Sequence, residues 1–254
     1  MIQRPDAGLS IVPPIEGVHS YPNRKVTTMS RFWTLGLSAV LAFTFAQGCG
    51  GTRSNFDGTD RSLTLLDAAL CSPTGDFTLE STNPYFPMDV GTQWVLEGGS
   101  ERVEVTVLDE TEIVAGVTTR VIEEREFKNG RVKEISRNYF AQASDGTVCY
   151  FGEAVDPHEG VWRADDPGSG PGIIMPADPR PGMAFKMEVA PGEAEDEAEI
   201  VEFKTTRVPA GTFAETIRVR ELDPLDNDSD YKVFARGVGI IIDENLKLVE
   251  LVTP

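Results

Sequence analysis

The sequence predicts an all-β fold, an antiparallel sandwich or an open half-barrel built from two similar β-meanders, with one short N-terminal helix. Three observations carry this prediction. From Thr92 onward, apolar and polar residues alternate with a period of two. The dipeptides Asn129-Gly130 and Asp145-Gly146, which tolerate positive φ, are typical of hairpin turns. With 17 Pro and 24 Gly among 254 residues, the chain favours turns over a helical bundle.

The alternation is clearest from Arg102 to Leu108, where three valines share one face and charged or polar residues share the other. This pattern is typical of a half-buried antiparallel strand. Arg61 to Leu70 is the plausible short helix, and its apolar positions are only loosely periodic. Further strand-like runs are 118–127, 132–141, 148–151, 200–208, 216–222, 232–235, 239–242 and 247–252.

Four landmarks recur in the same order and suggest a duplicated meander, with halves at 91–152 and 182–252. Each half opens with a Gly three residues before a large aromatic, Trp94 or Phe185. The alternative is that hairpins reuse the same few turn residues. The other three landmarks are an Ala-Gly pair, an Arg-Val-x-Glu strand and a Phe-Ala pair, at 115–116, 120–123 and 140–141 and again at 210–211, 218–221 and 234–235.

Residues 165–182, between the halves, contain five prolines. Because proline removes a donor from a β-ladder, this segment is predicted not to form a central strand. We expect either a linker or a rigid loop over one end of the sheet. The apolar run Ile173, Ile174 and Met175 favours a loop held against an apolar surface.

The amino-terminal region has the features of an export signal. Residues 32–46 form a weakly polar to apolar run behind Arg31. A transmembrane helix needs about 20 apolar residues, so this shorter run predicts a signal peptide. The run ends at AQGC (46–49), which resembles the lipobox of bacterial lipoproteins and implies cleavage before an acylated Cys49. The alternative is a plain signal peptide cut near Ala46, with Cys49 free.

These features divide the chain into segments. Residues 1–28 are polar and unpatterned, and are expected either to be disordered or to lie upstream of a true start at Met29. Gly50 is not the Asp that retains lipoproteins at the inner membrane of enteric bacteria, so the lipobox resemblance implies the outer membrane. The remaining segments are a signal peptide at 29–48, a flexible tether at 49–60, a short helix and loop at 61–83, and a single β domain at 84–254.

The chain is strongly acidic, with 41 Asp and Glu against 23 Lys and Arg and a formal net charge of −18. This balance argues against nucleic-acid binding, which requires surplus Lys and Arg. Cleavage before Cys49 would remove four basic and two acidic residues and leave a charge of about −20. Anionic headgroups would repel such a domain. The lipid anchor is therefore predicted to hold the protein at the membrane.

Part of the β domain resembles an uncharacterised group of exported bacterial proteins. The resemblance covers most of residues 84–252 and implies no activity and no cofactor. Where Cys149 stands, the group is expected to have an aromatic residue, so any role of that thiol is specific to this protein. The segments that carry the resemblance are GTQWVLEG (91–98), YFAQASDGTVCYFGE (139–153), PGIIMPADPRPG (171–182) and GEAEDEAEI (192–200).

Cys71 and Cys149 are the two cysteines outside the lipobox. An oxidising periplasm permits a disulfide between them. Cys149 lies in an apolar strand, where a buried free thiol is equally natural. The sequence does not give the distance between the two residues, so both states stay open.

Five large aromatic residues of the first half could line a cavity for a hydrophobic ligand. The alternative is that they are ordinary core residues, which is the commoner role of such side chains. These ligand-lining candidates are Trp94, Tyr139, Tyr150, Phe151 and Trp162.

The sequence predicts no catalytic residue, no cofactor and no metal site. His158 is the one histidine beyond the signal peptide, and no nucleophile motif accompanies it, so a solvated loop residue is expected. Residues 226–230 begin like a calcium-binding loop, but Tyr231 and Gly237 stand where that loop needs Gly and Glu. The acidic cluster at 193–199 is expected to be solvated, with calcium binding as the alternative.

The sequence therefore predicts a non-catalytic, membrane-anchored lipoprotein whose β scaffold binds an unknown protein or hydrophobic ligand. One alternative is a periplasmic carrier of a lipid or other hydrophobic ligand. Another, disfavoured by the missing motifs, is an exported hydrolase. A cavity of roughly 300 Å³ or more would favour the carrier, whereas a solid core with an exposed apolar patch would favour a protein partner.

Overall fold

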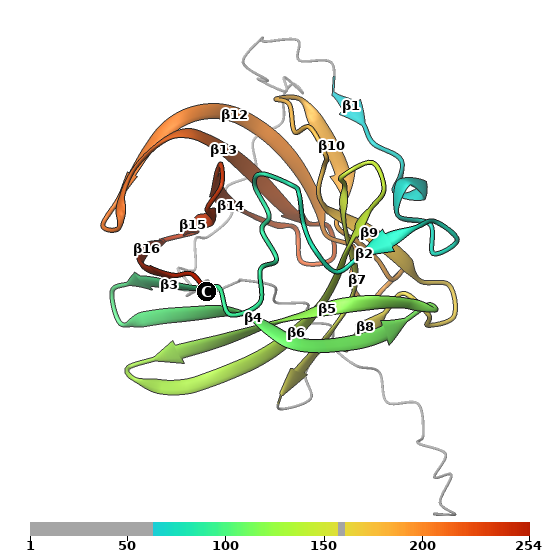
Figure 1. Cartoon of the computed structure of the whole chain (residues 1–254), viewed down its shortest axis with the longest axis horizontal. Coiled ribbons are helices and arrows are strands. Elements are labelled where there is room, and N and C mark those ends of the chain that lie inside the picture. The colour runs from blue at the N-terminus through green and yellow to red at the C-terminus, as the bar shows by residue number, and fades with distance from the viewer. Residues whose placement is uncertain (1–62, 157–160) are drawn as a thin grey trace, which may run out of the picture.

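The computed structural model describes residues 63–156 and 161–254, so the predicted signal peptide, Cys49 and His158 lie outside the described residues. Within them the chain is nearly all β, as predicted. Its strands form one large mixed sheet that is not closed into a barrel and that curves around a central space (Figure 1). The predicted sandwich and the predicted half-barrel are both compatible with this shape.

The predicted strand-like runs all lie in strands, and each half is a meander of antiparallel strands. The first half is an antiparallel meander of β3 (Gln93–Gly98), β4 (Glu101–Val114), β5 (Val117–Lys128), β6 (Arg131–Ala143) and β7 (Val148–Asp156). The second half is also an antiparallel meander and has one strand more: β10 (Met183–Lys186), β12 (Glu197–Val208), β13 (Gly211–Asp223), β14 (Asp228–Ala235), β15 (Gly239–Asp243) and β16 (Leu246–Val252).

The aromatic landmarks of the repeat occupy matching strands. Trp94 lies on the first strand of its half and Phe185 on the first strand of the other, and both are buried. Phe140 and Phe234 lie on the fourth strands, β6 and β14, and are buried as well. That the halves superpose residue by residue stays a prediction.

The Ala-Gly landmarks do not sit identically in the two halves. Ala115 and Gly116 are the two turn residues between β4 and β5, and both have positive φ. In the second half Val208 pairs with Gly211, so the turn residues are Pro209 and Ala210 and the glycine already belongs to β13. The fixed φ of proline suits the first position of such a turn and moves the turn back by one residue.

Two connections hold the halves together. At one side β16 pairs antiparallel with β3. At the other side the chain passes from one part of the sheet to the other at Met187. β10, before Met187, pairs with β12 of the second half. β11 (Glu188–Val189), after Met187, pairs with β9 (Gly170–Met175), which lies beside β7 of the first half. A methyl group at Gly172 would overlap the Met187 carbonyl, so glycine is required for this close approach.

The prediction that residues 165–182 hold no central strand is wrong, because β9 lies between β7 and β11. The physical reason is that the ladder to β7 begins at Gly172, one residue after Pro171. The missing N–H of Pro171 therefore interrupts no bond to β7. Ile173, Ile174 and Met175 are buried, as the apolar run suggested.

The predicted helix at 61–70 is also wrong. Residues 63–71 form instead the two-residue strand β1 (Thr64–Leu65), which pairs parallel with β10, and a 3₁₀ turn, η1 (Ala68–Cys71). The Asp67 side chain accepts a hydrogen bond from the Ala69 N–H and starts this turn. Pro73 disfavours helical backbone at the preceding residue, so the turn goes no further.

A disulfide joins Cys71 of η1 to Cys149 of β7, with 5.6 Å between the Cα atoms. Both cysteines are fully buried. The sequence left this bond open, and the structure supplies the distance that the sequence could not. The bond ties the amino-terminal part of the described chain to the sheet.

Replacing both cysteines, as Cys71→Ala with Cys149→Ala, should lower the free energy of unfolding by about 4 kcal/mol, because the bond closes a loop across 78 positions of the unfolded chain. Urea denaturation measures this loss. Wild-type protein in a strong reductant is the control and should unfold at nearly the same urea concentration as the variant. A variant as stable as the oxidised wild type would contradict the prediction.

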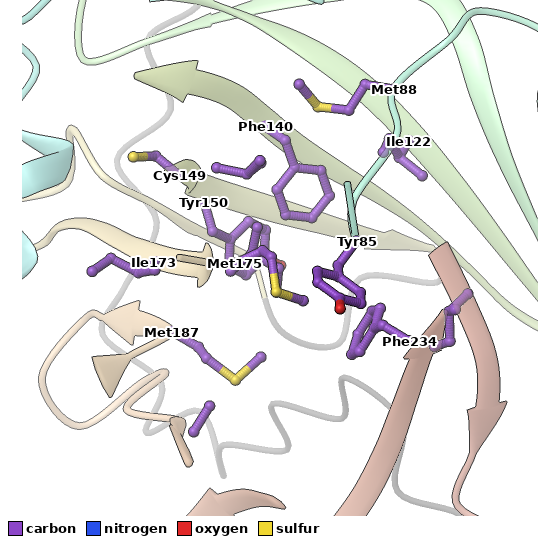
Figure 2. Packing of buried hydrophobic residues seen from close by; sticks show 14 of the residues in the cluster. Tyr85, Met88, Ile122, Phe140, Cys149, Tyr150, Ile173, Met175, Met187 and Phe234 are labelled. Atoms are coloured by element: carbon purple, nitrogen blue, oxygen red, sulfur yellow. The ribbon is translucent and has the colours of Figure 1, made fainter. Parts of the chain in front are cut away.

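Residues 79–92, which we call the inner segment, run from β2 (Phe77–Thr78) to β3 through the space that the sheet surrounds (Figure 1). Hydrogen bonds anchor it at both sides. Asn83 Nδ2 donates to the carbonyls of Gly146 and Pro176, and the Gly237 N–H donates to the Pro84 carbonyl. The inner segment thus places Tyr85 and Met88 in the buried core (Figure 2).

Candidate ligand site in the sheet interior

A small cavity remains between the inner segment and the inward faces of both halves. Its volume is about 60 Å³, which is room for roughly four water molecules at 10–15 Å³ each. The volume is well below the roughly 300 Å³ that would accept an acyl chain. The apolar lining comes from Tyr85, Phe86, Pro87, Trp94, Val105, Ile122, Phe140, Ile174, Phe234, Gly239 and Ile240.

Aromatic rings dominate the cavity wall. Figure 2 shows Tyr85 of the inner segment between Phe140 of the first half and Phe234 of the second. Phe86 contacts Phe140 edge to face, with ring centroids 5.1 Å apart. Trp94 closes another part of the wall and is fixed by its indole N–H, which donates to the Val238 carbonyl at 2.7 Å. Both halves and the inner segment are therefore needed to build the site.

Of the five aromatic residues predicted from the sequence, Trp94 lines the cavity. Tyr150 lies behind the cavity wall. Its ring stacks on that of Phe140, with centroids 4.8 Å apart, and meets that of Trp162 edge to face, with centroids 4.9 Å apart. Phe151 packs against Phe77, and Tyr139 lies under the guanidinium of Arg163. These four side chains are buried but do not belong to the cavity lining.

Four polar side chains also reach the cavity, and sequence analysis missed all of them: Glu124, Asn138, Glu221 and Lys232. A signal for three of them exists. Glu124 follows Ile122 by two positions on β5, Glu221 follows Val219 on β13, and Lys232 precedes Phe234 on β14. Residues two apart on a strand point to the same face of the sheet. Each of these three charged side chains therefore shares its face with an apolar side chain.

Lys232 is paired inside the sheet. Its Nζ lies 2.5 Å from Glu221 Oε2, and both side chains are almost completely buried. Burial alone would lower the pKa of Lys232, but the carboxylates of Glu221, Asp243 and Asp230 raise it above its ordinary value. The lysine therefore stays charged and neutralises part of a strongly acidic interior.

Unlike Lys232, Glu124 is buried and finds no partner for its carboxyl group among the described residues. The register places it in one row with Trp94 and Val105 across β3, β4 and β5. Its side chain is 5% exposed, and no hydrogen bond or ion pair to it is found within residues 63–156 and 161–254. Burial, followed by the nearby charge of Glu126, raises its pKa well above the ordinary value for Glu.

Further carboxyls are buried around this site. Burial and the charge of Glu188 raise the pKa of Asp196 to about 9, and burial and the charge of Glu221 raise that of Asp230 to about 8. Burial also raises the pKa of Glu153 and Asp243. One oxygen of Asp243 is buried without a hydrogen-bond partner in the described part of the chain.

Within residues 63–156 and 161–254, no three His, Cys, Asp or Glu side chains are grouped so that they could hold a metal ion. The acidic run at 226–230 forms a turn and the start of β14, and Asp223 accepts hydrogen bonds from the Leu225 and Asp226 N–H groups there.

Among all the residues that the structure describes, no helix has the length and apolar character needed to cross a bilayer.

Comparison with models of protein families, with curated proteins and with solved structures gave no match for this chain.

Proposed function

We propose that this protein is a non-catalytic lipoprotein, anchored through Cys49 to a bacterial membrane, whose β scaffold binds a small ligand in the interior cavity. The observation that carries the proposal is the cavity itself, with walls from both halves and buried polar groups at one part of its lining. Ligand sites in proteins typically combine such apolar walls with a few placed polar groups.

Two features support an exported, anchored protein. The sequence places a charged residue, a short apolar run and a lipobox-like AQGC in the order of a lipoprotein signal. The Cys71–Cys149 disulfide is of a kind that persists mainly in oxidising compartments such as the periplasm. The residue after the cysteine, Gly50, favours the outer membrane within this proposal.

A lipid carrier is the weaker candidate, because the cavity is too small for an acyl chain while the inner segment is in place. A hydrolase is disfavoured as well. Among the described residues that line the cavity there is no Ser, Cys or His to act as nucleophile or as an ordinary base.

Native mass spectrometry of the full-length protein, purified from membranes of a producing bacterium, tests the proposed ligand. We expect a species heavier than the lipidated chain by one small molecule. Val105→Phe should remove that species, because Val105 lines the cavity and the larger ring fills it. Ile113→Phe, on the exposed part of the same strand, is the control and should retain the species. Equal ligand content in all three proteins would overturn the proposal.

Lipidation predicts a second result. Cys49→Ser should abolish labelling with radioactive palmitate and move the protein from the membrane fraction to the soluble fraction, because the acidic domain has no attraction of its own for anionic lipid. Cys71→Ala with Cys149→Ala is the control and should keep its label, since those cysteines are joined to each other. Membrane association that survives in Cys49→Ser would contradict the anchor.

A further inference from the structure

The Glu124 carboxyl is the polar group of the cavity whose burial the chain leaves uncompensated. It is 5% exposed, lines the cavity and has no hydrogen bond or ion pair within the described ranges. Buried carboxyls without partners are rare in folded proteins, because the lost hydration is not replaced. A group of this kind at a cavity wall is expected where a ligand supplies the missing partner.

Glu126 provides an internal comparison. It lies two positions further along β5, is similarly buried, and is bonded to Lys133 Nζ at 3.0 Å. The fold therefore can satisfy a buried carboxylate on this strand. The described residues supply such a partner for Glu126, which does not line the cavity. They supply none for Glu124, which does line the cavity.

The charged groups of the cavity lining determine which charge a ligand should carry. Lys232 is the one cationic side chain among the lining residues, and Glu221 already binds it at 2.5 Å. The carboxyls of Asp243 and Asp230 also lie near this lysine. With the lysine bound to Glu221, the described lining offers no second cation to an anionic ligand, whereas the Glu124 carboxyl can accept hydrogen bonds from a cationic donor.

The cavity walls limit the kind and the size of ligand that can bind. The rings of Tyr85, Trp94, Phe140 and Phe234 offer faces that attract a cation as well as apolar carbon. The volume of about 60 Å³ admits a group of only a few heavy atoms. A peptide, a nucleotide or a whole lipid does not fit this space.

We infer that the cavity binds a small organic amine in its ammonium form, with Glu124 as its counter-ion and the aromatic side chains around its carbon atoms. This inference rests on the proposed ligand-binding function and names the chemical class of the ligand. On binding, Glu124 gives up its proton to solvent, and the resulting carboxylate accepts hydrogen bonds from the ammonium group. The charged groups that set this equilibrium are Glu126, Lys232, Glu134 and Glu221.

Titration calorimetry at pH 7 with three probes that share a four-carbon chain tests the inference: n-butylamine, 1-butanol and butyrate. For the wild-type protein we expect the amine to bind at least tenfold more tightly than the alcohol, and butyrate least tightly. A charge-assisted hydrogen bond is worth a factor of this order. Titrations in two buffers of different ionisation enthalpy should show proton release with the amine and none with the alcohol.

Glu124→Gln should reduce amine affinity at least tenfold, abolish proton release and change alcohol affinity by no more than about twofold, because the amide keeps the shape but not the charge. Glu126→Gln is the matched control and should keep the preference for the amine over the alcohol. Equal affinity of the wild type for amine and alcohol would overturn the inference while leaving the proposed function intact. Preference for butyrate, or binding of none of the probes, would overturn it too. Val105→Phe in native mass spectrometry reports separately on the proposed function.

Discussion

The free energy of unfolding should fall by several kcal/mol as the pH rises from 5 to 9. The cause is the set of carboxyls buried in the interior, whose pKa values are raised by the loss of hydration. Burial first, and then the charge of a neighbouring carboxylate, raises the pKa of Asp196 to about 9 and that of Asp230 to about 8. The pKa values of Glu124, Glu153 and Asp243 are raised for the same primary reason.

The sign follows from proton binding. In the unfolded chain these carboxyls ionise near pH 4, whereas in the folded protein they keep their protons to higher pH. Between the two pKa values the folded state binds more protons than the unfolded state, so stability decreases as the pH increases. One such carboxyl loses about 1.4 kcal/mol for each pH unit in that window. The raised pKa of Lys232 acts only above pH 10.5, outside this range.

Urea denaturation at pH 5, 7 and 9 measures the effect. Asp196→Asn should flatten the profile, because it removes one of the groups with a strongly raised pKa. Asp178→Asn is the control and should leave the profile unchanged, since Asp178 is exposed and pairs with Arg180 at the surface. A stability that is constant or rises from pH 5 to pH 9 would show that these carboxyls are ionised in the folded protein.

Replacing the buried lysine should have an effect of similar size. Lys232→Met should lower the free energy of unfolding by about 3–5 kcal/mol at pH 7, the usual loss when one partner of a buried ion pair is removed. Glu221, which lies 2.5 Å from the lysine, would lose its counter-ion, and Asp243, the ladder neighbour of Lys232 on β15, would lose the positive charge beside it. Denaturation by urea or heat gives the value.

A second substitution separates this effect from simple misfolding. Adding Glu221→Gln to Lys232→Met should restore a large part of the lost stability, because the carboxylate no longer needs a counter-charge. Lys204→Met is the control for an exposed ion pair, that of Lys204 with Glu202 at 3.3 Å, and should change stability by less than about 1 kcal/mol. A Lys232→Met protein as stable as the wild type would mean that the pair contributes little.

The strands could be predicted from the sequence because each carries its own periodic signal. The alternation in β4 reflects burial of one face, and the glycines after Asn129 and Asp145 reflect turn backbone, so neither depends on distant parts of the chain. β9 could not be predicted in this way. Its proline is tolerated only because the ladder to β7 begins one residue later, which is a property of its neighbours.

The candidate site was far less accessible to sequence reasoning. Its lining combines strands of both halves with the inner segment, whose residues follow the shape of the interior and so carry no period. Trp94 was identified because it is large and aromatic. Glu124 was not, although a glutamate on the apolar face of a predicted strand, two positions after Ile122, is the kind of conflict that marks functional positions.

The pairing of β16 with β3 also has a consequence for the order of assembly. The hairpins within each half join neighbouring residues and can form early, whereas this ladder joins residues such as Leu251 and Trp94 from nearly opposite ends of the described chain. Closing so long a loop is slow, because its entropy is lost before the contacts form. Until then β3 presents a free edge to which another chain could add. The β3–β4 hairpin is therefore protected from aggregation only once β16 has paired with β3.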